Sequence, residues 1–154
     1  MKKAIKLTIA ITVFVVTLTA CHKENRYSNK LMDGGVWNVT DITVDGTSLN
    51  IKGKWYIGTI EDIEKAVPSC EWKSENDTTS AIFDWQFLNK GKEFHLAYVQ
   101  QANEDGETLS ELDYLAYDIS GKYDVICHKN SLMEFSSKST IKYNGQVVYI
   151  TIER

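Results

Sequence analysis

Residues 83–98 of this 154-residue chain, FDWQFLNKGKEFHLAY, contain the pattern that decides the fold. Over residues 83–87, aromatic residues alternate with polar ones, and this period of two is typical of a β-strand with one buried face. Residues 89–92 are polar, include a glycine and predict a turn, after which apolar residues alternate again over residues 94–98. The stretch therefore predicts an antiparallel hairpin.

The same alternation recurs on both sides of this hairpin. Trp37 and Val39 share one parity whereas Ile42 and Val44 share the other, so we expect a β-bulge between the two pairs. Asn144-Gly145 is the strongest short hairpin signal in the chain. Further strands are predicted at residues 54–57, 70–72, 115–119, 123–127, 132–135, 141–143 and 147–150.

Eight to ten short strands in a meander predict an all-β, mainly antiparallel fold. We expect a closed up-and-down barrel of about eight strands, because closure removes the exposed edges that a long open meander would present. One short helix is expected at residues 59–67, where apolar residues recur at helical spacing before Pro68. Residues 101–111 are acidic and polar and predict an exposed loop.

The N-terminal segment differs from the rest of the chain. It has three lysines and then an uncharged run of 14 residues, from Leu7 to Ala20, too short for a helix that crosses a bilayer. We interpret residues 1–20 as a removable signal peptide. Leu18-Thr19-Ala20-Cys21 resembles the lipobox of bacterial lipoproteins, which implies cleavage before Cys21 and its acylation, with palmitate among the acyl chains. Residues 21–30 would then be a polar, unstructured, lipidated tether, and residues 31–154 a single barrel domain.

The charge of the chain bears on its partners. Without the three lysines of the signal peptide, 14 basic and 21 acidic residues remain, a net charge of −7. This acidity argues against a nucleic-acid partner and against binding to anionic lipid through side chains. We therefore expect the acyl chains on Cys21 to be the membrane anchor. Because His22 and not Asp follows Cys21, the resemblance to lipoproteins implies the outer membrane of the bacterial cell envelope, in either leaflet.

Gly35-Val36-Trp37, at the start of the first predicted strand, resembles the Gly-x-Trp signature of lipocalins. The whole domain is similar to the lipocalin-like lipoproteins of bacteria. The resemblance implies an eight-stranded barrel that carries a ligand, with Gly35 and Trp37 as the structural signature. It also implies that Trp37 plugs the closed end and that a basic residue after the last strand lies against it, for which Arg154 is the candidate.

Aromatic residues on the predicted strands are candidates for lining a ligand cavity in the barrel. The alternative is that the same rings fill the interior completely. The candidates are Trp55, Phe83, Trp85, Phe87, Phe94, Tyr98 and Tyr117. The leading hypothesis is a non-enzymatic, membrane-anchored protein that binds a small apolar ligand. The alternative is a protein-interaction module with a filled core, such as an inhibitor, immunity-type or assembly lipoprotein. In that case the acidic residues 101–111 are the first candidate for the partner-binding surface.

Two cysteines remain besides Cys21. In an exported protein Cys70 and Cys127 either form a disulfide or stay as two unpaired, buried thiols.

Residues with catalytic or metal-binding chemistry are scattered. His95 and His128 have no partner at zinc-site spacing, so we expect no metal and no cofactor. A glycosidase uses a pair of carboxylates, and the candidates for such a pair are Asp113, Asp118 and Asp124. We expect instead that these side chains lie on solvent-exposed strand faces. No nucleophile, phosphate-loop or dinucleotide motif is present, and we expect no enzyme.

Overall fold

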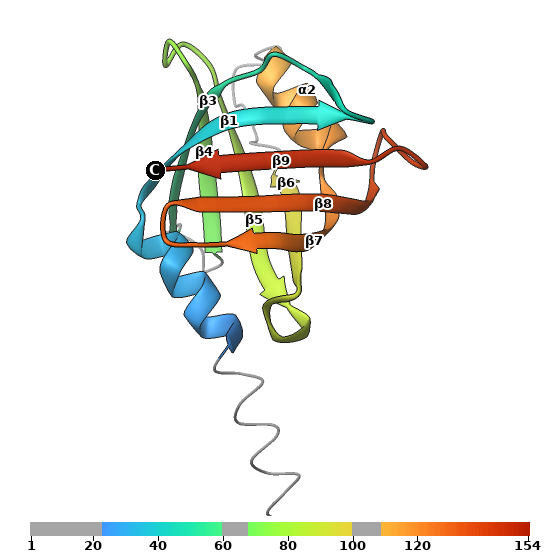
Figure 1. Cartoon of the computed structure of the whole chain (residues 1–154). Coiled ribbons are helices and arrows are strands. Elements are labelled where there is room, and N and C mark those ends of the chain that lie inside the picture. The colour runs from blue at the N-terminus through green and yellow to red at the C-terminus, as the bar shows by residue number, and fades with distance from the viewer. Residues whose placement is uncertain (1–22, 60–67, 100–108) are drawn as a thin grey trace, which may run out of the picture.

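The computed structural model describes residues 23–59, 68–99 and 109–154. Within these ranges the chain forms nine β-strands, an α-helix over residues 23–33, the α-helix α2 (Glu111–Asp118) and the short 3-10 helix η1 (Asn89–Gly91), as Figure 1 shows. The strands are β1 (Val36–Val44), β2 (Thr47–Ser48), β3 (Gly53–Thr59), β4 (Pro68–Ser74), β5 (Ser80–Leu88), β6 (Glu93–Val99), β7 (Gly121–His128), β8 (Leu132–Thr140) and β9 (Val148–Glu153).

All strands belong to one antiparallel sheet. They follow chain order from β3 to β9, and β1 pairs with β3 on one side and with β9 on the other, which closes an eight-stranded barrel. The two-residue β2 pairs with the end of β1. The structure confirms the predicted all-β, up-and-down, lipocalin-like barrel. The helix 23–33, η1 and the β7–β8 turn lie at one end of it, which we call the helix end, and α2 and the β8–β9 loop lie at the opposite α2 end (Figure 1).

The predicted hairpin at residues 83–98 is confirmed as β5 and β6. Phe87 pairs with Phe94 and Phe83 with Tyr98, so the two strands present their aromatic residues in register. The predicted bulge in the first strand is also present, because the pairing of β1 with β9 shifts between Val39 and Asp41. This shift turns both halves of β1 inward and buries the apolar residues Trp37, Val39, Ile42 and Val44 in the barrel.

The prediction of an unstructured tether over residues 21–30 is wrong for residues 23–30, which belong to the helix 23–33. Tyr27 and Leu31 are four residues apart and therefore share one face of this helix. Leu31 is fully buried, and Tyr27 packs against the core. Two apolar residues in a polar segment were too weak a pattern to predict a helix. None of the helices in the described ranges is long and apolar enough to cross a membrane.

The strand predicted at residues 115–119 is wrong, because α2 occupies this position. Ser110 begins the helix with a capping box: its hydroxyl accepts from the Asp113 N–H, and the Asp113 carboxylate accepts from the Ser110 N–H. Leu115 and Ile119 are buried on one helix face, whereas Tyr117 is 49% exposed. A spacing of four residues fits both the helical and the strand period, so alternation alone misassigned the segment.

The predicted helix and the predicted acidic loop fall mostly outside the described residues, whereas the predicted C-terminal hairpin lies within them. The helix predicted at 59–67 falls outside them except for Thr59, which ends β3. Residues 101–108 of the predicted acidic loop also fall outside them. The turn at Asn144-Gly145 does join the last two strands, but residues 141–143 are not a strand, because β8 ends at Thr140.

A contact between the first and last strands closes the helix end. The Trp37 indole N–H donates to the Leu31 carbonyl at 2.9 Å, and the Arg154 guanidinium lies 4.5 Å from the centroid of the Trp37 ring. Arg154 also donates to the Lys30 carbonyl at 2.7 Å. The expected contact between Trp37 and a basic residue after the last strand is therefore present, and it ties β1 and β9 to the helix.

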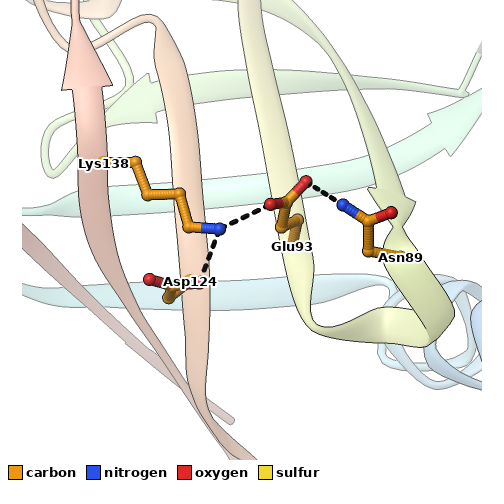
Figure 2. A network of polar contacts seen from close by, with 4 residues as sticks. All are labelled: Asn89, Glu93, Asp124 and Lys138. Atoms are coloured by element: carbon orange, nitrogen blue, oxygen red, sulfur yellow. Dashed lines mark hydrogen bonds and ion pairs between the residues drawn. The ribbon is translucent and has the colours of Figure 1, made fainter.

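A polar network crosses three strands on the outer face of the barrel, as Figure 2 shows. The Lys138 ammonium on β8 pairs with Glu93 on β6 and, at 3.0 Å, with Asp124 on β7. Asn89 donates to the other oxygen of Glu93. The hydrogen bond from Lys138 lowers the pKa of the Glu93 carboxyl below its ordinary value. The Glu93 carboxylate thus stays charged at neutral pH, and the Lys138 ammonium links β6, β7 and β8 through its two ion pairs.

The contact between Trp37 and Arg154 leaves no room for a side chain at Gly34. A substitution there therefore tests the packing at the helix end. A Cβ on Gly34 would lie 2.4 Å from Trp37 Nε1 and 2.6 Å from Arg154 Nε, whereas a Cβ on Gly58 of β3 would meet nothing within 4 Å. Gly34→Ala should therefore lower the free energy of unfolding by about 1–3 kcal/mol, the usual cost of overpacking. Urea unfolding measures this change. Gly58→Ala is the control, expected within about 0.5 kcal/mol of the wild type, and equal stability of the two variants would contradict the packing described.

Candidate functional site

Five of the seven predicted ligand-binding residues meet inside the barrel. Each is at most 4% exposed, because their positions along β3, β5 and β6 all face the core. The ring centroids of Trp55 and Phe83 lie 4.8 Å apart, and those of Phe87 and Phe94 lie 5.1 Å apart. The Trp85 ring stacks on that of Phe94 at 6.4 Å. The five rings therefore form two contact groups, one of Trp55 with Phe83 and one of Trp85 with Phe87 and Phe94.

Tyr98 lies opposite Phe83 and packs against the core, whereas Tyr117 lies outside this group on α2. Their rings meet edge to face at 6.3 Å near α2, and Tyr117 is exposed. The Tyr98 hydroxyl donates to Asp113 at 3.0 Å. Burial raises the pKa of Tyr98 to about 12, and the hydrogen bond to Asp113 adds to this rise. Tyr98 thus stays neutral and helps to hold α2 on the barrel.

Four further large side chains complete the interior, although they were not predicted as candidates. Phe135 stacks on Phe94 at 4.4 Å, and Trp72 meets Trp55 edge to face at 6.2 Å. Tyr123 donates its hydroxyl proton to a backbone carbonyl next to α2. The four residues are Trp72, Tyr123, Met133 and Phe135, all fully buried. Each follows the alternation of its strand, so the signal for them was present in the sequence. Together with the five rings they belong to one buried hydrophobic cluster.

Two indole groups in this interior have no partner. Trp37 and Trp85 donate their indole N–H groups to backbone carbonyls, each at 2.9 Å. In contrast, Trp55 Nε1 and Trp72 Nε1 are buried and make no hydrogen bond with the described residues. Buried donors are normally paired with protein or ordered water, so these two N–H groups are open to an acceptor.

Tyr27 of the helix 23–33 covers the interior at the helix end. Its ring stacks on His128 with centroids 3.6 Å apart and meets the Phe87 ring edge to face at 5.8 Å. Gly91, at a φ of +78°, makes room for Tyr27, because a Cβ there would lie 2.3 Å from the tyrosine ring. The Glu24 carboxylate accepts a hydrogen bond from the backbone N–H of Lys90 at 2.6 Å.

The α2 helix lies across β5 and β6 at the opposite end of the barrel. Leu112, Leu115 and Ala116 on its inner face are buried. The buried Ser120 hydroxyl donates to the Ala116 carbonyl at 2.8 Å and accepts from the Tyr98 N–H, which fixes the helix to β6. Both ends of the barrel therefore carry a helix that contributes side chains to the core.

The largest described groove is on the outside of the barrel, over β4 to β7, with a volume of about 490 Å³. Asp84, Gln86, His95 and Lys122 contribute its polar side chains. Partial burial raises the pKa of Asp84, and burial together with the charge of Lys122 lowers the pKa of His95. His95 is therefore neutral at neutral pH. The groove presents one acid, one base and a neutral imidazole, with no nucleophile among the residues that line it.

The three carboxylates considered for catalysis have separate structural partners. Asp113 caps α2, Asp118 pairs with Lys142 at 2.5 Å and Asp124 pairs with Lys138 at 3.0 Å. In the described ranges, no group of three or more His, Cys, Asp and Glu side chains is arranged to hold a metal ion.

Cys70 and Cys127 are free thiols, so of the two alternatives the structure has the unpaired one. Cys70 is buried on β4 and Cys127 is half-buried on β7, and β5 and β6 separate these strands in the sheet. Burial, assisted by the charge of Glu71, raises the pKa of the Cys70 thiol well above its ordinary value. Cys70 therefore acts as a small apolar residue of the core.

The different burial of the two thiols predicts different reactivity. At pH 8 a maleimide should label Cys127 in the folded protein and label Cys70 only after unfolding, because Cys70 is both enclosed and protonated. Peptide mapping by mass spectrometry identifies the labelled positions, and protein unfolded in urea before labelling is the control. Recovery of a peptide that links residues 70 and 127 would show a bridge and contradict the structure.

No protein-family model, curated protein or solved structure shows a significant match to this chain. The resemblance to lipocalins therefore consists of the barrel architecture and the Trp37–Arg154 contact, and function is inferred from the geometry of the chain itself.

Proposed function

We propose that this protein is a lipid-anchored lipoprotein of the bacterial outer membrane that binds a protein partner through the outside of a solid barrel and catalyses no reaction. The anchor is the acylated Cys21 of the lipobox-like stretch. The observation that carries the proposal is the packing of large rings inside the barrel. Trp55 is fully buried and in ring contact with Trp72 and Phe83, and Phe94 is fully buried and stacked on Phe135.

The α2 end offers a surface for such a partner. Of the six exposed large hydrophobic residues in the described ranges, Tyr114, Tyr117, Ile141 and Val147 belong to α2 and the β8–β9 loop. Ile141 lies beside α2, because its N–H donates to the carbonyl of Ser120. Exposed tyrosines and aliphatic residues supply much of the binding energy at protein interfaces. The acidic side chains of α2 and the acidic sequence before it favour a partner with a basic surface.

A second candidate function, the carriage of a small apolar ligand inside the barrel, is favoured by the unpaired indoles. A ligand with one acceptor oxygen between Trp55 Nε1 and Trp72 Nε1 would satisfy two buried donors. Such a ligand requires the surrounding rings to move apart. The protein-binding barrel and the ligand carrier therefore differ in whether the native interior binds a small molecule.

An engineered cavity distinguishes them. Phe94→Ala should remove about 3–5 kcal/mol of stability and open a cavity within the ring cluster. For a solid barrel, indole, benzene and decanoate should raise the melting temperature of the Phe94→Ala variant and leave that of the wild type unchanged. Differential scanning calorimetry of both proteins provides the measurement. Ile126→Ala, at an exposed position of β7, is the control that opens no cavity. A rise for the wild type would favour the ligand carrier and overturn the solid barrel.

The anchor has a separate test in cells. Cys21→Ser should prevent acylation and move the protein from the membrane to the soluble fraction, or leave it unprocessed, because the thiol that carries the lipid is absent. Fractionation with metabolic labelling by an alkyne fatty acid detects both effects. Cys127→Ser is the matched control and should stay acylated and membrane-bound. A Cys21→Ser protein that remained processed, labelled and membrane-bound would refute the lipoprotein assignment.

A further inference from the structure

Basic side chains gather at the helix end of the barrel around the Tyr27–His128 stack. Lys90 and Lys92 flank the glycine against which Tyr27 rests, and Lys129 follows His128 directly. Burial lowers the pKa of His128, and the positive charges of Lys30 and Arg26 lower it further. We call this cluster the basic end. It consists of Lys23, Arg26, Lys30, Lys90, Lys92 and Lys129.

None of these six side chains makes an ion pair with another described residue, whereas Lys138 on the barrel wall is paired with both Glu93 and Asp124 (Figure 2). Of the described acids at this end, Glu24 accepts a backbone hydrogen bond from Lys90, Glu134 is half-buried, and Asp33 and Glu153 are exposed. Among the described residues, basic side chains therefore outnumber acidic ones here, although the whole chain is acidic.

The opposite end carries charges of both signs. Its described basic residues are Lys52, Lys54, Lys73, Lys122 and Lys142, of which Lys73 is paired with Glu71 and Lys142 with Asp118. The described acids there are Asp45, Glu75, Asp77, Glu111, Asp113 and Asp118. Acids therefore slightly outnumber bases among the described residues of this end, and the net charge of the whole molecule does not describe the field at either end.

The position of Cys21 relates the basic end to the bilayer. Cys21 precedes Lys23 by two residues, so their Cα atoms can be at most about 7 Å apart. The helix that begins at residue 23 is fixed to the barrel by Tyr27, Leu31 and the Arg154 hydrogen bond to Lys30. The lipid anchor and the basic end therefore lie on the same side of a rigid domain.

We propose that the basic end is a membrane-binding surface that docks on anionic lipid headgroups, so that the barrel stands on the bilayer with the α2 end pointing away. The inference rests on the acylation of Cys21 in the proposed function, which brings these side chains to the membrane. Each lysine or arginine near an anionic surface adds to the attraction, which decays within a Debye length. The exposed Tyr114 and Tyr117 of α2 are then presented to partners outside the bilayer.

Lysine footprinting of the mature, acylated protein tests this orientation. The protein is reconstituted in vesicles of phosphatidylcholine alone or of phosphatidylcholine with phosphatidylglycerol, and exposed lysines are acetylated and quantified by mass spectrometry. In the anionic vesicles, Lys90, Lys92 and Lys129 should react at least about threefold more slowly than in the neutral ones, whereas Lys52 should not change. The protection should disappear in about 1 M salt, where the Debye length is about 3 Å.

Two charge reversals provide a matched pair. Lys129→Glu should reduce the protection of Lys90 and Lys92, whereas Lys52→Glu, at the other end and with the same change in net charge, should not. Protein that floats with the vesicles but shows equal reactivity at both ends, or protection independent of lipid charge, would overturn the membrane-binding surface and leave the anchor intact. Protein that does not float with either vesicle would overturn the anchor and this inference with it.

Discussion

Antiparallel pairing between β1 and β9 is the constraint on which the rest of this structure depends. It removes the two free edges of a long meander and brings residues from opposite ends of the domain together. The bulge between Val39 and Asp41 lets β1 keep this pairing while both of its halves face the core. Closure also places Arg154 on the ring of Trp37, whose N–H holds the helix 23–33 through the Leu31 carbonyl.

Large side chains determine the character of the barrel interior. An eight-stranded barrel has an interior that large side chains can fill, and four tryptophans and several phenylalanines point into this one. Their rings meet in the region where the lipocalin resemblance implied a ligand. The buried indole N–H groups of Trp55 and Trp72 have no partner among the described residues.

The helix 23–33 bears on how the proposed anchor at Cys21 and the domain are related. An unstructured tether would let the domain rotate freely above the bilayer. A helix fixed by the Tyr27–His128 stack and by Glu24 instead gives the domain a defined side toward Cys21. The same side carries the unpaired basic residues, and the opposite side carries the exposed tyrosines of α2. Polarity of this kind is invisible in a net charge of −7 for the mature chain.

By itself the sequence determined the strand order, the central hairpin, the bulge in β1 and the inward positions of Trp55, Phe83, Trp85, Phe87 and Phe94. These follow from a period of two, which depends only on neighbouring residues along a strand. Only the tertiary structure decided that residues 111–118 are helical, that Tyr27 anchors a helix, and that Cys70 and Cys127 stay apart. Each of these outcomes depends on which surfaces meet across the closed barrel, and local periodicity contains no information about such long-range contacts.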